Sequence, residues 1–100
     1  MTQKLFSDKY EQYWSQLKPR DKVLIHSKHF FDHCSEATKR AGPMFTTGMT
    51  EYCSKMLSVL QLHKNNDPTC IVRFYVNDML YKWCDVFCHK LIIRNYKLLL

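Results

Sequence analysis

The sequence predicts a mainly α-helical fold, a compact bundle of about four helices with at most a small two-stranded element. Of its 100 residues, 46% are hydrophobic and 24% are charged, which is typical of a chain that folds around a core. Apolar residues recur every three or four positions over most of the chain. Only two glycines and three prolines interrupt it, so residues 1–100 are expected to form a single small globular domain.

The first predicted helix follows Ser7, a residue type that caps helix N-termini, and ends before Pro19. Tyr10, Trp14 and Leu17 lie at positions i, i+4 and i+7, which places them on one face. We therefore expect this aromatic face to pack inward, with Trp14 in the core.

The second predicted helix runs from Asp21 to Ala41 and ends at Gly42-Pro43. Its apolar arc contains Val23, Phe30, Cys34, Ala37 and Ala41. One alternative remains open, because the apolar run within residues 22–26 is equally typical of a short buried strand.

The third predicted helix begins at Thr47 or Thr50 and continues to the Asn-Asn-Asp-Pro turn at residues 65–68. Cys53, Leu57 and Leu60 stack along one side of it. This spacing predicts a helix that packs on its neighbours.

Residues 69–76 carry the clearest strand pattern, because they are dense in β-branched and aromatic side chains. A single strand needs a partner, and residues 22–26 are the segment that offers one. If these two segments pair, the fold is α+β instead of mainly α.

The last predicted helix begins at Asn77 or Asp78 and extends to Leu98. Its apolar arc comprises Leu80, Cys84, Phe87, Cys88, Leu91 and Leu98, and Trp83 at its edge is a second expected core residue. A hairpin through residues 77–78 is the alternative, but the apolar period of 3.6 residues favours a helix.

Six residues of this helix form the predicted partner-binding surface, in which cations surround two aliphatic side chains. They are Lys82, Val86, Lys90, Ile93, Arg94 and Lys97. Such a mixed surface suits an acidic protein groove or a phosphate backbone. A protein partner is favoured because the net charge of +6 is spread along the chain, with one smaller cluster at Lys18, Arg20 and Lys22.

A zinc site is a further alternative, because His26, His29 and His33 recur at helical spacing, as do Cys84 and Cys88. The ligands of this site would be His29, His33, Cys84 and Cys88. Zinc sites usually contain close pairs of ligands separated by a short loop, and this pattern is absent. No metal or cofactor is therefore expected.

No catalytic motif is present, so the sequence predicts a non-enzymatic adaptor or inhibitor that binds a protein. Nucleic-acid binding through the same helix is the alternative, and self-association is a third interaction to consider. The five cysteines, the polar start at Met1–Lys9 and the lack of a membrane span favour the cytoplasm or nucleus. The 11 lysines to four arginines suit a small viral accessory protein.

Overall fold

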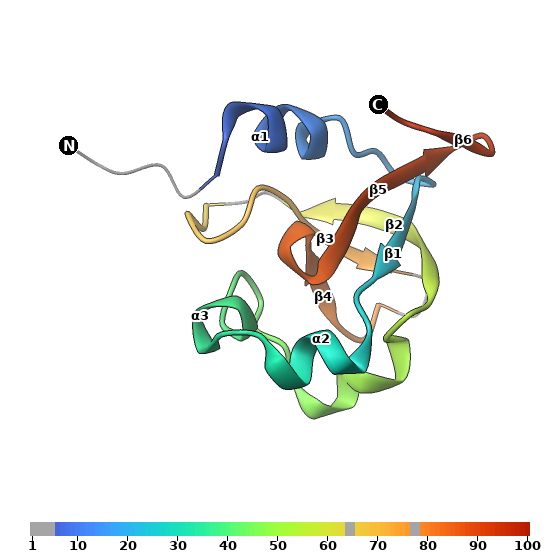
Figure 1. The fold of residues 1–100 in the computed structure, drawn as a ribbon. Helices are drawn as coiled ribbons and strands as arrows, with labels where there is room; N and C mark the ends of the chain where they lie inside the picture. The colour runs from blue at the N-terminus through green and yellow to red at the C-terminus, as the bar shows by residue number, and fades with distance from the viewer. Residues whose placement is uncertain (1–5, 64–65, 77–78) are drawn as a thin grey trace.

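A six-stranded antiparallel sheet forms the centre of the molecule (Figure 1). The computed structural model describes residues 6–63, 66–76 and 79–100. The strand order is β4-β3-β2-β1-β5-β6, and α1 lies at the opposite end of the molecule from α2 and α3. The elements are α1 (Asp8–Ser15), β1 (Lys22–Ile25), α2 (Lys28–His33), α3 (Glu36–Lys39), η1 (Thr47–Tyr52), β2 (Met56–His63), β3 (Arg73–Val76), β4 (Lys82–Cys84), η2 (Asp85–Phe87), β5 (Cys88–Arg94) and β6 (Lys97–Leu98). The predicted helical bundle is therefore wrong, and the fold is mainly β.

The first predicted helix is confirmed as α1. The Ser7 hydroxyl accepts a hydrogen bond from the backbone N–H of Tyr10, which caps the helix as expected. Trp14 is fully buried, and Leu17 is buried just beyond the end of the helix. For α1, the capping residue Ser7 and the proline that follows the helix were sufficient to predict where the helix lies.

The predicted helix over residues 21–41 is wrong, and the strand alternative for its first part is confirmed. Val23 and Ile25 in β1 are both 0% exposed, so alternate side chains enter the core. Two short helices follow, each started by a serine. The Ser27 hydroxyl accepts from the N–H of Phe30 in α2, and Ser35 caps α3 in the same way.

The helix predicted from residue 47 or 50 is also wrong, because this segment divides into a short 3-10 helix, η1, and the long strand β2. The strand predicted at residues 69–76 is present over Arg73–Val76. It does not pair with residues 22–26, because β2 lies between β1 and β3. The expected two-stranded element is therefore wrong: both segments belong to the six-stranded sheet, but they are not neighbours in it.

The last predicted helix is replaced by β4, η2, β5 and β6. Its predicted start at residues 77–78 lies outside the described residues. Among those described, the inward-facing side chains include Cys84, Cys88 and Ile92, which come from two strands. Their spacing of four residues imitates the period of a helix.

The core lies between the sheet and the helical segments around it. Trp14, Phe74, Trp83 and Phe87 are each 0% exposed, which confirms the two tryptophans predicted to be core residues. Phe45, which follows α3, contacts Trp83 of β4 with ring centroids 6.5 Å apart, and Tyr13 of α1 accepts a hydrogen bond from the N–H of Ile92 in β5. No helix in the described part of the chain combines the length and hydropathy needed to cross a membrane.

His26, directly after β1, packs against two other aromatic rings. Its ring stacks on Phe30 with centroids 3.8 Å apart and lies 4.2 Å from the ring of His89. Burial, together with the charge of His89, lowers the pKa of His26 to about 4 from its usual 6.5.

We expect the free energy of unfolding to fall as the pH decreases from about 6.5 to about 4, since the unfolded chain takes up a proton that folded His26 rejects. With solvent screening, this contribution is about 1 kcal/mol. A His26→Phe variant keeps the stacking on Phe30 and is expected to lose this part of the pH dependence. Urea unfolding at pH 7 and pH 5 measures it, and equal pH dependence in both proteins would contradict the assignment.

Candidate functional site

Three of the six predicted partner-binding residues lie in separate environments. Lys82 is in β4, with its Nζ 5.9 Å from the ring centroid of Tyr75. Val86 is in η2, half-buried against the core. Lys90 is in β5, with its Nζ 5.5 Å from the ring centroid of Tyr13. The helix face that was expected to join them is not formed.

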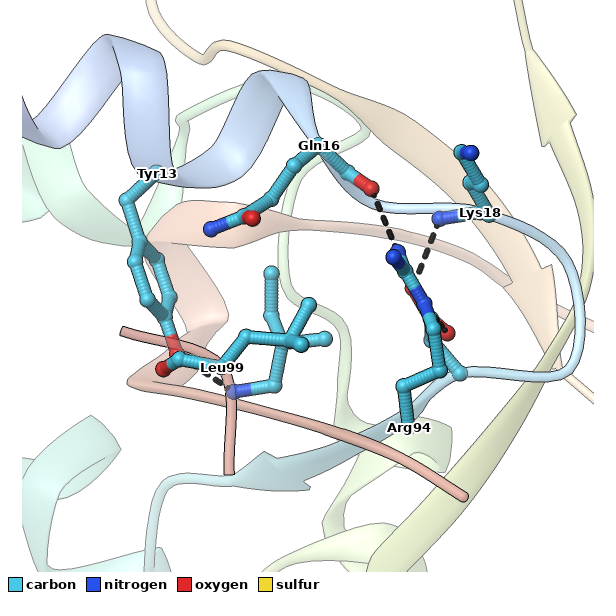
Figure 2. A network of polar contacts seen from close by, with 7 residues as sticks. Tyr13, Gln16, Lys18, Arg94 and Leu99 are labelled. Carbon is cyan, nitrogen blue, oxygen red and sulfur yellow. Dashed lines mark hydrogen bonds and ion pairs between the residues drawn. The ribbon is translucent and has the colours of Figure 1, made fainter. Parts of the chain in front are cut away.

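The guanidinium of Arg94 is hydrogen-bonded to other groups of the same chain (Figure 2). Its Nε and Nη2 donate to the two carboxylate oxygens of Asp21 at 2.8 Å each, and Nη2 also donates to the carbonyl of Gln16. Asp21 is 2% exposed and accepts a further bond from the N–H of Lys18. Burial acts to raise the pKa of Asp21, but the hydrogen bonds from Arg94 and Lys18 lower it overall. This network joins the end of α1 to β1 and β5.

Ile93, by contrast, lines an open cavity of about 420 Å³, which we name the Tyr96 pocket. The lining consists of two cations, an aromatic ring, an amide and two apolar side chains, with no carboxylate among the lining residues. These are Arg20, Lys22, Met56, Ile93, Asn95 and Tyr96. Lys97, the last of the predicted residues, is exposed and follows Tyr96 in the chain.

The floor of the Tyr96 pocket is the outer face of the sheet. Lys22 lies opposite Ser58 on β2 and opposite Ile93 on β5, and Ile93 in turn lies opposite Leu98 on β6. Directly opposed residues project from the same side of a sheet. Because neighbouring Val23 points into the core, this row of side chains faces outward.

One wall of the pocket comes from the turn before β1. The N–H of Asp21 donates to the carbonyl of Lys18 at 3.1 Å, with Pro19 at the second position and Arg20 at the third. Arg20 has a φ of 77°, so the turn has the character of a type II turn, which favours glycine at this position. Its N–H donates to the carbonyl of Val59 at 2.7 Å, which fixes the turn against β2.

A further part of the lining comes from the hairpin between β5 and β6. Arg94 pairs with Lys97, which leaves Asn95 and Tyr96 as a two-residue connection. Their φ values of 51° and 65° are those of a type I′ turn, in which glycine is preferred at the second position. Tyr96 is 96% exposed, and the Nζ of Lys22 lies 6.0 Å from its ring centroid.

Two bulky side chains therefore occupy positions where the backbone favours glycine, and both line the same pocket. A left-handed conformation costs a residue with a side chain about 1 kcal/mol relative to glycine. The Tyr96 ring, which is almost fully exposed, gains no core packing in return. Met44 and Met79 are also left-handed and partly exposed, so what distinguishes Arg20 and Tyr96 is that both line one cavity.

Tyr96 was missed from the sequence, where residues 95–96 were assigned to the interior of a helix. A signal was available: asparagine tolerates the left-handed conformation and often begins a tight hairpin turn. The cluster of Lys18, Arg20 and Lys22 was recognised, but nothing local connected it to residues 93–96.

The four predicted zinc ligands are not brought together. His29 and His33 lie on the exposed side of α2, with ring centroids 4.2 Å apart, whereas Cys84 and Cys88 are buried. Within the described ranges, the one group of three close metal-type donors is Cys70, Cys84 and Asp85.

That buried group is organised by hydrogen bonds. Asp85 accepts from the hydroxyl of Tyr10 at 2.6 Å and from the N–H groups of Ile71 and Val72 at 2.8 and 2.9 Å. Burial raises the pKa of the Cys84 and Cys88 thiols well above the usual value, and the nearby Asp85 adds to this. The three hydrogen bonds that Asp85 accepts tie α1 to residues 71–72.

Comparison with known proteins assigns no family to the chain: no protein-family model, curated protein or solved structure matches it. Function is therefore inferred from the Tyr96 pocket itself.

Proposed function

We propose that the protein is a non-enzymatic binding module that holds nucleic acid at the Tyr96 pocket. The observation that carries this proposal is the presence of Arg20, Lys22 and the exposed Tyr96 ring in one cavity whose lining includes no carboxylate. Cations bind the phosphate backbone, and aromatic rings stack on bases. The net charge of +6 adds long-range attraction for a polyanion.

A protein partner is the alternative. It was preferred from the sequence because the net charge of +6 is spread along the chain and because two aliphatic residues were expected on a helix that is not formed. At the observed surface, Met56 and Leu98 are 44% and 53% exposed and favour such a partner. Two cations in a cavity whose lining includes no carboxylate favour nucleic acid more strongly, since cationic side chains gain most from a partner rich in phosphates.

Salt dependence tests the proposal. Binding of a labelled oligonucleotide should weaken as salt increases, and Lys22→Gln or Arg20→Gln should each reduce the log–log slope by about 0.7 for a single strand or 0.9 for a duplex. At low salt each variant should bind about fivefold to tenfold more weakly, as expected for one lost phosphate contact.

Lys39→Gln is the matched control, because Lys39 lies on α3, away from β6 in Figure 1, and contacts Glu36 at 3.8 Å. Its neutralisation changes the net charge equally but leaves the pocket intact. Equal losses of affinity in all three variants would mean that the net charge of the protein, and not the Tyr96 pocket, determines binding. An affinity that does not depend on salt would contradict nucleic-acid binding and favour the protein partner.

A further inference from the structure

We infer that the Tyr96 pocket recognises single-stranded nucleic acid, with an unpaired base stacked on Tyr96 and the adjoining phosphates on Arg20 and Lys22. This inference rests on the proposed function and adds the strand state and the role of one side chain. It predicts that the Tyr96 ring serves binding at the expense of hairpin stability.

The position of Tyr96 supports a role in binding. At the second residue of a type I′ turn, glycine adopts the left-handed conformation without the steric cost that a side chain carries. Tyr96 has a φ of 65° and is 96% exposed, so its ring contributes almost nothing to the core. Because the Nζ of Lys22 lies over one face of this ring, the opposite face is the one presented for stacking.

The surroundings of the ring match the parts of a nucleotide. The apolar side chains of Met56 and Ile93 line the same cavity and can contact a base or sugar. Asn95 supplies an amide that both donates and accepts hydrogen bonds at a base edge. Lys22, 6.0 Å from the ring centroid, places a positive charge near the phosphate that adjoins a stacked base.

This geometry favours a single strand over a duplex. In a duplex, the faces of the bases are covered by their neighbours, so an aromatic ring can stack only at an end or after a base is extruded. An unpaired base presents its face without that cost. The pocket is an open cavity of about 420 Å³, which leaves an unpaired base free access to the Tyr96 ring.

The test measures fluorescence anisotropy with three probes: a 12-nucleotide thymidine strand, an abasic strand of equal length and charge, and a 12-base-pair duplex. The wild-type protein should bind the thymidine strand about tenfold more tightly than the abasic strand, because stacking is lost without bases. It should also bind the thymidine strand more tightly than the duplex.

Variants at Tyr96 separate binding from folding. Tyr96→Phe keeps the ring and should bind the thymidine strand within about twofold of wild type, whereas Tyr96→Ala and Tyr96→Gly should bind it about tenfold more weakly. Tyr96→Gly should at the same time raise the melting temperature by several degrees, because glycine relieves the left-handed strain. A structural role for the ring would instead lower it.

The outcomes distinguish this inference from the proposed function. If the thymidine and abasic strands bind equally and Tyr96→Ala is neutral, while Lys22→Gln still weakens both, the stacking inference is wrong and nucleic-acid binding stands. Tighter binding of the duplex overturns the preference for a single strand. If none of the probes binds, or if a polyglutamate peptide competes fully with the thymidine strand, the proposed function fails as well.

Discussion

Arg94→Met is expected to lower the free energy of unfolding by about 3 kcal/mol at pH 7, because it leaves the buried carboxylate of Asp21 without its charge partner. Asp21 is 2% exposed and receives two hydrogen bonds from the Arg94 guanidinium at 2.8 Å. Methionine preserves most of the side-chain length, so the loss reports the charged contacts. Urea unfolding monitored by tryptophan fluorescence measures it.

The pH dependence of this loss identifies its cause. In the wild type, the depressed pKa of Asp21 contributes stability that is complete above the usual pKa of 3.8 and is lost as the pH falls through the lower, folded-state value. Without Arg94, burial should raise the pKa of Asp21, so the variant gains a proton more readily in acid. The difference between the two proteins should therefore shrink toward pH 4.

A double-mutant cycle provides the control. Asp21→Asn should be strongly destabilising in the wild type but much less so in the Arg94→Met background, since the interaction is then already lost. Additive effects of the two substitutions would mean that the ion pair does not stabilise the fold.

The local part of the fold could be predicted from the sequence, and α1 is the example. Its cap at Ser7 and its stop before Pro19 are encoded within a few residues. The C-terminal strands could not be predicted, because the pairing of β1 with β5 is irregular: Val23 lies opposite Ile92, whereas Ile25 lies opposite Cys88. Two extra residues on β5 therefore separate its inward side chains by four positions, the spacing of a helix.

The candidate site depends still more on strand register. Lys22, Met56 and Ile93 come from three strands that are distant in the sequence, and only the pairing of β1 with β2 and β5 brings them together. Lys22 and Ile93 were both singled out, but for different surfaces. Tyr96 was not singled out. Hairpins are recognised in a sequence by glycine at the second position of the turn, and this chain has a tyrosine there.

Asp85→Ala is expected to lower the free energy of unfolding by about 3–4 kcal/mol, which tests the second buried carboxylate. Asp85 is 0% exposed and accepts hydrogen bonds from the Tyr10 hydroxyl and from the N–H groups of Ile71 and Val72. Alanine leaves these three donors without an acceptor, and each unpaired buried group costs about 1–3 kcal/mol before relaxation. Urea unfolding at pH 7 gives the value.

Asp85→Asn is the matched control, because it keeps the shape of the side chain. Its amide oxygen can accept from the N–H groups of Ile71 and Val72, and its amide nitrogen can donate to the oxygen of the Tyr10 hydroxyl. The expected loss is about 1 kcal/mol, close to that of a single hydrogen bond. Equal losses for alanine and asparagine would show that the negative charge, and not the hydrogen-bond pattern, holds α1 against residues 71–72.

The two buried carboxylates should respond to pH in opposite directions. Burial raises the pKa of Asp85, although the hydrogen bond from Tyr10 acts to lower it. This group therefore contributes stability that is complete below the usual pKa of 3.8 and is lost as the pH rises through the folded-state value. The cost of Asp85→Asn should accordingly be larger at pH 4 than at pH 7, whereas the cost of Arg94→Met should be smaller at pH 4. If the costs of both substitutions changed with pH in the same direction, the direction of the pKa shift given for Asp21 or for Asp85 would be wrong.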